Sequence, residues 1–191
     1  RYYHKLAQAY LSNSREQEAL ETYEKVREID PGNPEVHLFL SDFYRKKGEH
    51  DRAFNELKTG FSSGRLDIDT KVKILLSLYT FEETDENLKG QGMELCKLLV
   101  ETHPKEAKSY TIYGDFLYRD QKLEEARLQF RKAIELDDKR YPIWNQLLVI
   151  ESQLSDFKAM EQESESALEL FPNQPAVYLF NGIAKSQNKK Y

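Results

Sequence analysis

Few side chains in this sequence have the types and spacing that chemistry requires. The four histidines are far apart and form neither an HExxH motif nor an i, i+4 pair with another ligand-type residue: His4, His37, His50 and His103. We expect them at turns or on the surface. Gly90 and Gly92 begin like a dinucleotide-binding fingerprint, but the third glycine is missing and a helical pattern, not a strand, precedes them. We interpret Gly90 as part of a loop and Gly92 as a small residue at a helix contact.

The single cysteine is no better a candidate for catalysis. Cys96 has no positioned base that the sequence reveals, and it can form neither an internal disulfide nor a CxxC metal pair. We expect it to face the core. No GxSxG, P-loop or paired-carboxylate constellation stands out. The sequence therefore predicts a protein that is not an enzyme and that holds no cofactor or metal.

The composition excludes further classes of function. The chain has 191 residues, of which 39% are hydrophobic and 32% charged, so it carries more surface than a compact globule of this length. The net charge is −5 and no basic stripe is present, which disfavours nucleic-acid binding. No apolar run reaches the roughly 18 residues of a membrane-spanning helix. The cellular compartment is not predicted.

The chain repeats itself at an interval of 34 residues. A bulky or long side chain opens each copy, and successive openers are 34, 34, 39, 34 and 34 residues apart: Tyr3, His37, Lys71, Tyr110, Trp144 and Tyr178. The longer interval contains a five-residue insertion around residues 82–89. Later in the copies a small residue precedes an aromatic residue by four positions, as in Ala19 with Tyr23 and Ala126 with Phe130. A fixed period of this length is typical of repeats that each contain one helix pair.

These motifs resemble the tetratricopeptide (TPR) repeat, whose signature is W-x2-L-G-x2-Y, then A-x3-F, then P. The fourth copy matches best, at Tyr110, Tyr113, Gly114, Leu117, Ala126, Phe130 and Ala133, and closing prolines recur at Pro31, Pro104 and Pro172. The fifth copy departs from the signature, with Met160 and Ser164 where alanine and an aromatic residue are expected. The resemblance covers essentially the whole chain. It implies an all-α fold, a right-handed α-solenoid of antiparallel helix pairs known as the TPR superhelix.

Amphipathic periodicity supports the same fold independently. Apolar residues at i, i+3, i+4 and i+7 spacing, with charges on the other faces, predict eleven helices, at residues 2–12, 15–29, 33–47, 50–62, 67–82, 86–102, 106–119, 123–136, 140–154, 157–170 and 174–188. We expect one array over residues 1–191, with repeats at about 1–33, 34–67, 68–106, 107–140 and 141–174 and a half repeat at 175–191. Because both ends fall inside a repeat, we expect a fragment of a longer array.

The resemblance implies a binding surface. In TPR solenoids the first helix of each repeat lines a concave groove that takes peptides or helices from partners. Carried over by register, the groove candidates are Phe39, Asp42, Tyr79, Asp115, Tyr118, Arg119, Asn145 and Phe180. The aromatic candidates could equally pack against neighbouring helices, and the sequence leaves both roles open. The groove between the third and fifth repeats is favoured, because the insertion lies there and Tyr79 and Tyr118 occupy equivalent positions one repeat apart.

The expected function is a protein-binding or peptide-binding scaffold, part of a larger bacterial protein. The alternative is a sensory or regulatory TPR segment of a larger signalling protein or enzyme. Some TPR domains hold chaperone C-terminal tails with a clamp of lysine, asparagine and arginine on three first helices. No window of three first helices reproduces that clamp here, so we do not expect a chaperone tail as the ligand. The identity of the partner is not predicted.

Overall fold

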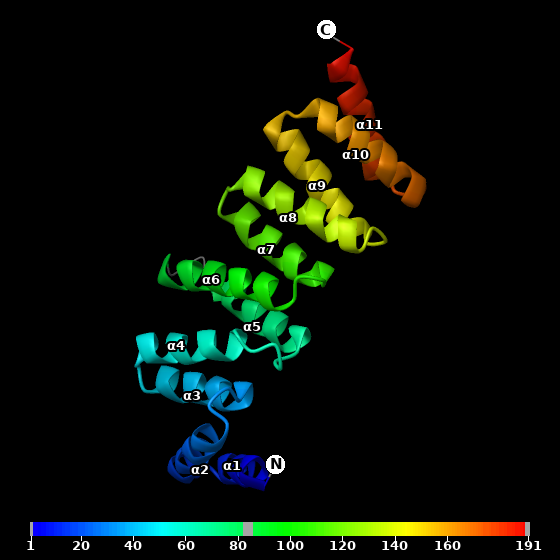
Figure 1. The fold of residues 1–191 in the computed structure, drawn as a ribbon. Coiled ribbons are helices and arrows are strands. Elements are labelled where there is room, and N and C mark those ends of the chain that lie inside the picture. The colour runs from blue at the N-terminus through cyan, green and yellow to red at the C-terminus, as the bar shows by residue number, and fades with distance from the viewer. Residues whose placement is uncertain (1, 82–85, 190–191) are drawn as a thin grey trace. The chain divides into compact units, whose positions relative to one another are not determined.

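The computed structural model describes residues 2–81 and 86–189, without the side chains of residues 4, 79–81 and 86–89. In this part of the chain all regular structure is α-helical (Figure 1). Its eleven helices are α1 (Tyr2–Ser12), α2 (Glu16–Ile29), α3 (Pro34–Lys46), α4 (His50–Phe61), α5 (Ile68–Phe81), α6 (Glu86–Thr102), α7 (Ala107–Arg119), α8 (Leu123–Leu136), α9 (Tyr141–Leu154), α10 (Phe157–Leu170) and α11 (Pro175–Asn188). Every helix end lies within one residue of its predicted position, which confirms the all-α prediction.

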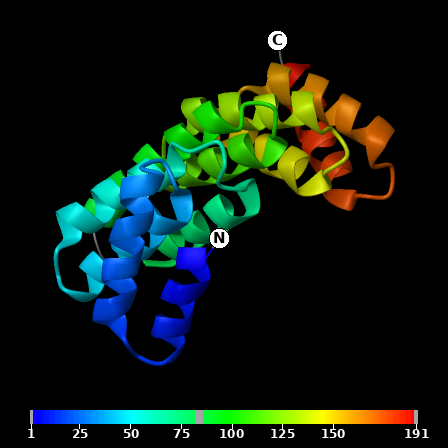
Figure 2. The same ribbon diagram turned by 60° about the horizontal axis from the view of Figure 1, so that its bottom comes forward.

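The chain divides into two compact units, Arg1–Ser77 and Leu78–Tyr191. Consecutive helices pack in pairs within each unit: α1 with α2 and α3 with α4 in the first, and α7 with α8 and α10 with α11 in the second. In both ribbon views the partners of these pairs run antiparallel (Figure 1, Figure 2). That residues 1–191 form one continuous superhelical array stays a prediction.

The turns inside the repeats share one backbone feature. A residue with positive φ lies between the first and second helices of four repeats: Ser14 (56°), Gly48 (77°), Gln121 (58°) and Ser155 (56°). Left-handed backbone is unfavourable for residues with a Cβ, so only the glycine adopts it without strain. Side chains cap three of the described helix starts. Asn33 accepts hydrogen bonds from the backbone N–H groups of Glu35 and Val36 at α3, Asp67 accepts one from Thr70 at α5, and Asp156 accepts one from Ala159 at α10.

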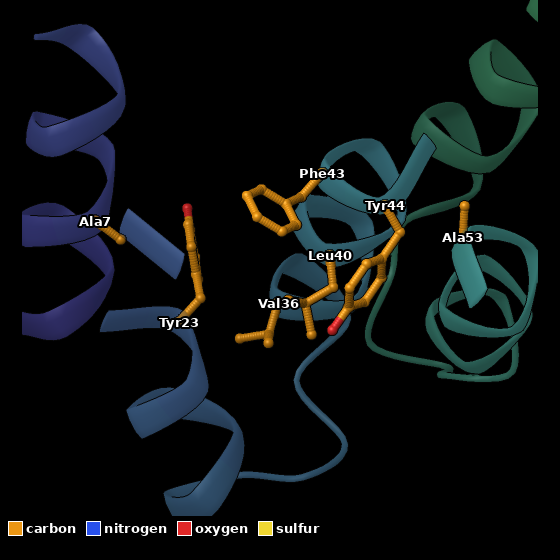
Figure 3. Packing of buried hydrophobic residues seen from close by; sticks show 7 residues of the cluster. All are labelled: Ala7, Tyr23, Val36, Leu40, Phe43, Tyr44 and Ala53. Carbon is orange, nitrogen blue, oxygen red and sulfur yellow. The ribbon is translucent and has the colours of Figure 1, made fainter. Parts of the chain in front are cut away.

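The core of the first unit lies between successive helices. Tyr23 of α2 stands between Ala7 of α1 and the α3 residues Val36 and Phe43 (Figure 3). Ala7 and Val36 are fully buried. Because the small residue allows α1 and α2 to approach, the aromatic ring can fill the space toward the next repeat.

In the second unit, the fourth and fifth repeats place the small and the large residue at opposite positions of the helix pair. A Cβ added to Gly114 of α7 would lie 2.9 Å from the ring of Phe130, so the best-matching repeat requires glycine there. The equivalent positions of the next repeat hold Leu148 and Ser164, both fully buried. In this repeat the leucine on the first helix fills the space that the aromatic ring on the second helix fills in the repeat before it. This replacement explains why the fifth repeat departs from the signature.

Candidate functional site

Three of the candidate residues share one face of α7. Asp115, Tyr118 and Arg119 are spaced i, i+3 and i+4, and each is half-buried. Their neighbours Gly114 and Phe116 are buried against the rest of the second unit. The packing of α7 on α8 therefore fixes the orientation of this face.

Asp115 has an unusual electrostatic environment. Its carboxylate has no hydrogen bond and no ion pair within the described structure, although charged side chains are frequent in this chain. Burial raises the pKa of Asp115 from 3.8 to about 6, and no charged neighbour contributes to that shift. Asp115 is thus a partly desolvated acid that nothing described in the structure neutralises.

Tyr118 joins this face to the next first helix. Its hydroxyl accepts a hydrogen bond of 2.9 Å from the side-chain amide of Gln153 on α9, and its ring packs against the core cluster around Leu117 and Phe130. Asn145 lies about two turns before Gln153 on α9, and its side-chain oxygen accepts a hydrogen bond of 3.2 Å from the Tyr141 hydroxyl. Gln153 was not predicted from the sequence, although it lies one repeat after the candidate Arg119 at the equivalent position.

We call these five residues the α7–α9 face: Asp115, Tyr118, Arg119, Asn145 and Gln153. Arg119 is also engaged in interactions of its own. The structure therefore brings four of the predicted candidates onto α7 and α9 within one unit.

The remaining aromatic candidates lie in different surroundings. Phe39 of α3 stacks on Tyr23, with ring centroids 4.2 Å apart and planes inclined by 26°. Phe180 of α11 packs against the core cluster that contains Trp144. Both rings thus help to hold helices together. The side chain of Tyr79 and residues 82–85 of the insertion lie outside the described residues, while residues 86–89 form the first turn of α6.

Asp42 of α3 is paired. Its carboxylate accepts a hydrogen bond of 2.6 Å from Arg45 and lies 3.1 Å from the ammonium group of Lys46. Burial raises the pKa of Asp42, but the hydrogen bonds from these two cations outweigh it, so the pKa lies below its ordinary value. This carboxylate is already neutralised within its own helix.

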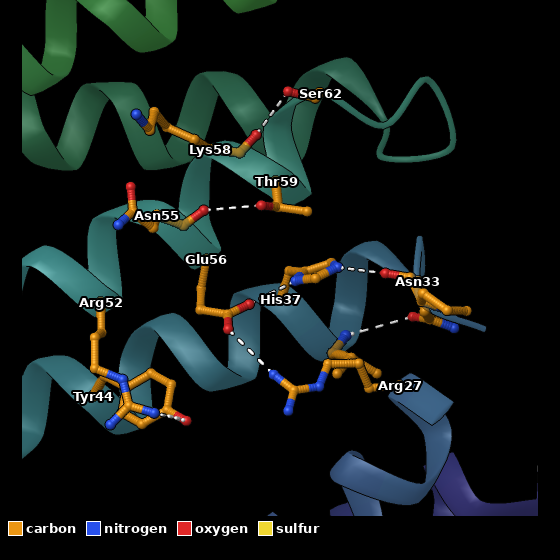
Figure 4. A network of polar contacts seen from close by, with 12 residues as sticks. Arg27, Asn33, His37, Tyr44, Arg52, Asn55, Glu56, Lys58, Thr59 and Ser62 are labelled. Carbon is orange, nitrogen blue, oxygen red and sulfur yellow. Dashed lines mark hydrogen bonds and ion pairs between the residues drawn. The ribbon is translucent and has the colours of Figure 1, made fainter. Parts of the chain in front are cut away.

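His37 corrects the expectation that the histidines lie at turns or on the surface. It is only 6% exposed, and it bridges two elements of the first unit (Figure 4). Its Nδ1 lies 2.6 Å from a carboxylate oxygen of Glu56 on α4, and its Nε2 lies 2.8 Å from the carbonyl oxygen of Pro31. The openers Lys71 and Trp144 are buried as well, whereas the openers Tyr3 and Tyr178 are exposed, so the opener position alone does not decide the burial of His37. In the described residues no three potential metal ligands of the His, Cys, Asp or Glu type lie together.

The structure contradicts the interpretation of Gly90 and confirms that of Cys96. Gly90 lies inside α6, so its assignment to a loop was wrong, because the helix begins at Glu86 and continues through it. Cys96 is fully buried, as expected for a thiol that faces the core. None of the helices described is long and apolar enough to cross a membrane.

A buried charge network between α8, α9 and α10 was missed at the sequence level. Glu151 is fully buried and binds Arg131 at 2.8 Å and Arg127 at 3.4 Å, and Arg131 also binds Glu163 at 2.6 Å. Burial and the nearby charge of Glu151 raise the pKa of Glu163 to about 7. These ion pairs connect neighbouring helices of the second unit, and they reach from the fully buried Glu151 to the partly exposed Arg131.

The chain is similar to known repeat proteins in sequence and in structure. No curated protein sequence matches it. A crystal structure of MamA protein has a TM-score of 0.57 at 17% identity, with 82% of each chain covered. YrrB, described as a TPR protein with an unusual peptide-binding site, has a TM-score of 0.54 at 17% identity, covering 92% of this chain and 88% of YrrB. The structure of MamA residues 41-end from Desulfovibrio magneticus RS-1 has a TM-score of 0.51 at 17% identity, and the match covers 91% of this chain and 96% of the MamA chain.

At these identities the solved structures establish only the fold. The family models carry the assignment: models described as Tetratricopeptide repeat match residues 6–69 and residues 107–140, which together make up more than half of the sequence. The chain therefore belongs to the tetratricopeptide repeat family.

Proposed function

We propose that this chain is a non-enzymatic scaffold that binds a protein or peptide partner through the α7–α9 face. TPR proteins are typically protein-interaction scaffolds and are generally non-catalytic. YrrB, which has the same fold, is described as having a peptide-binding site. The proposal transfers that kind of ligand, and not a particular partner, to this chain.

The hydrogen bond between Tyr118 and Gln153 is the observation that carries the proposal. It links two successive first helices on their polar, solvent-exposed side, while the buried cores beneath them hold the helices in place. A partner would therefore meet aromatic and amide groups at fixed spacing and would lose little free energy in ordering them. Tyrosine provides a large contact area with a polar tip, which suits a binding hot spot.

The test compares Tyr118→Ala with a control on the second helix of the same repeat. Leu128 of α8 is 59% exposed and lies outside the α7–α9 face, so Leu128→Ala is the control. Affinity capture with the intact chain identifies a partner, and isothermal titration calorimetry then measures the Kd for each variant. We expect Tyr118→Ala to weaken binding by about 2 kcal/mol or more and Leu128→Ala to leave it unchanged.

A purely structural role of Tyr118 predicts the opposite pattern. Its truncation would then lower the free energy of unfolding by roughly 3–5 kcal/mol, while the affinity of the folded fraction would stay intact. Tyr118→Phe keeps the packed ring and removes only the hydroxyl that binds Gln153. An unchanged Kd for Tyr118→Ala in folded protein would contradict the proposed function.

A further inference from the structure

Asp115 is the only acid on the α7–α9 face, and its side chain has features of a binding residue. It lies between the buried residues Gly114 and Phe116, which fix the backbone beneath it. The carboxylate is half-buried and forms neither a hydrogen bond nor an ion pair in the described part of the chain. Partial burial of a carboxylate costs free energy unless a hydrogen-bond donor or a cation compensates it.

From this placement we propose that Asp115 binds the side chain of a lysine or arginine in the partner peptide. The proposal rests on the function proposed above and specifies the chemistry of the partner at one position. The pKa of Asp115, raised by burial alone, agrees with a carboxylate that no cation approaches in the free chain.

The chain's own cations do not take this role. Arg119 lies one turn further along α7, but it contributes nothing to the pKa shift of Asp115 and has interactions of its own. Lys122 pairs with Asp120 at 2.7 Å. A cation from outside is therefore the group that would complete the site.

A basic side chain fits this site better than a metal ion. Metal ions need several ligands, and no three His, Cys, Asp or Glu side chains converge within the described residues. A lysine or arginine needs one carboxylate, and its apolar stem can lie along the neighbouring ring of Tyr118. A charge-assisted hydrogen bond in a partly desolvated place is stronger than one in bulk water.

The experiment uses a phage-displayed library of random peptides, each about a dozen residues long, selected against the intact chain. The best peptide is synthesised in two forms, one with its basic residue and one with methionine in that place. Both are titrated against the wild type, Asp115→Asn and Glu135→Gln. Glu135 is an exposed acid on α8, so Glu135→Gln removes the same charge away from the α7–α9 face.

We expect the selected peptides to share a lysine or arginine at one position. Its replacement by methionine should weaken binding to the wild type and to Glu135→Gln at least tenfold. The two peptides should bind Asp115→Asn within twofold of each other, because the carboxylate that distinguishes them is gone. Thermal unfolding of Asp115→Asn confirms that the variant is folded.

Two results would overturn the inference, and they differ in what they say about the proposed function. In the first result, the selected peptides bind Tyr118→Ala more weakly than the wild type, but replacing a basic residue of the peptide has the same effect on Asp115→Asn as on the wild type. This result would refute the inference about Asp115 and would leave the proposed function in place. If no peptide is selected, or if those selected bind Tyr118→Ala as well as the wild type, both proposals fail.

Discussion

Asp42 in the first unit and Asp115 in the second occupy the same position of their repeats, five residues after the openers His37 and Tyr110. The structure gives them opposite environments. Asp42 is held by Arg45 and Lys46 at 2.6 and 3.1 Å, whereas Asp115 has no cation beside it in the described structure.

The residues three and four positions later explain this difference. Arg45 and Lys46 follow Asp42 on the same helix face and both pair with it. After Asp115 these positions hold Tyr118, which binds Gln153, and Arg119, which contributes nothing to the pKa of Asp115. The repeat register thus predicts which residues share a face, and the neighbouring side chains decide whether a charge on it is free for a partner.

The largest expected effect concerns a third acid, Glu151, which is fully buried between two arginines. Its replacement by alanine would remove the fully buried partner of both arginines and leave a cavity, while Arg127 would keep its pair with Asp156 and Arg131 its pair with Glu163. We expect the free energy of unfolding, measured with urea, to fall by about 2–4 kcal/mol. A loss below about 1 kcal/mol would mean that these ion pairs do not contribute to the stability of the second unit.

The register of the fourth repeat, on which the comparison depends, is tested by Ala126→Leu. Ala126 is fully buried on α8, so the larger side chain should overpack the helix pair. The expected cost is about 1–3 kcal/mol, visible as a lower Tm. Leu128 is exposed on the same helix, so Leu128→Met serves as the control. An unchanged Tm for Ala126→Leu would show that the register is wrong.

Ionisation of Asp115 should make the free energy of unfolding depend on pH. Since its pKa is raised from 3.8 to about 6, its stabilising contribution is complete below pH 3.8 and is lost as the pH rises through about 6. Asp115→Asn should therefore gain stability relative to the wild type as the pH increases from about 4 to about 7. After allowance for solvent screening we expect on the order of 1–2 kcal/mol, from urea unfolding at each pH. If the difference in the free energy of unfolding between Asp115→Asn and the wild type does not change with pH, the Asp115 carboxylate is not desolvated in the folded chain.

The smallest effect is expected at Asp42. Its pKa is lowered, so its contribution is present above pH 3.8 and is lost as the pH falls below that value. The pairs are exposed, with 43% of the Asp42 side chain accessible, so Asp42→Asn should cost only about 0.2–1 kcal/mol at neutral pH. High salt should reduce this cost, and a cost that is independent of salt would argue against ion pairing.

The helices and the face of α7 could be predicted from sequence because their signals are local. Apolar spacing and the closing prolines define the helices, and the 34-residue register places Asp115, Tyr118 and Asn145 on first helices. The structure bears out the helix positions. Whether the predicted residues bind a partner stays a prediction.

The environments of the polar residues could not be predicted, because they depend on contacts between helices. Glu151 stands where the best-matching repeat has Leu117, and only the approach of Arg127 and Arg131 from α8 explains a glutamate there. His37 is a partial exception. The repeat register places it at an opener position, which is also buried at Lys71 and Trp144, but its partner Glu56 lies on another helix.

The most direct test of the central claim is a carboxyl ¹³C NMR titration of Asp42 and Asp115, without and with the selected peptide. We predict that Asp115 titrates with a pKa of about 6 in the free chain, that Asp42 titrates below its ordinary value, and that the peptide lowers only the pKa of Asp115. Titration of both carboxyls at the same pH, with no response of Asp115 to the peptide, would contradict this prediction.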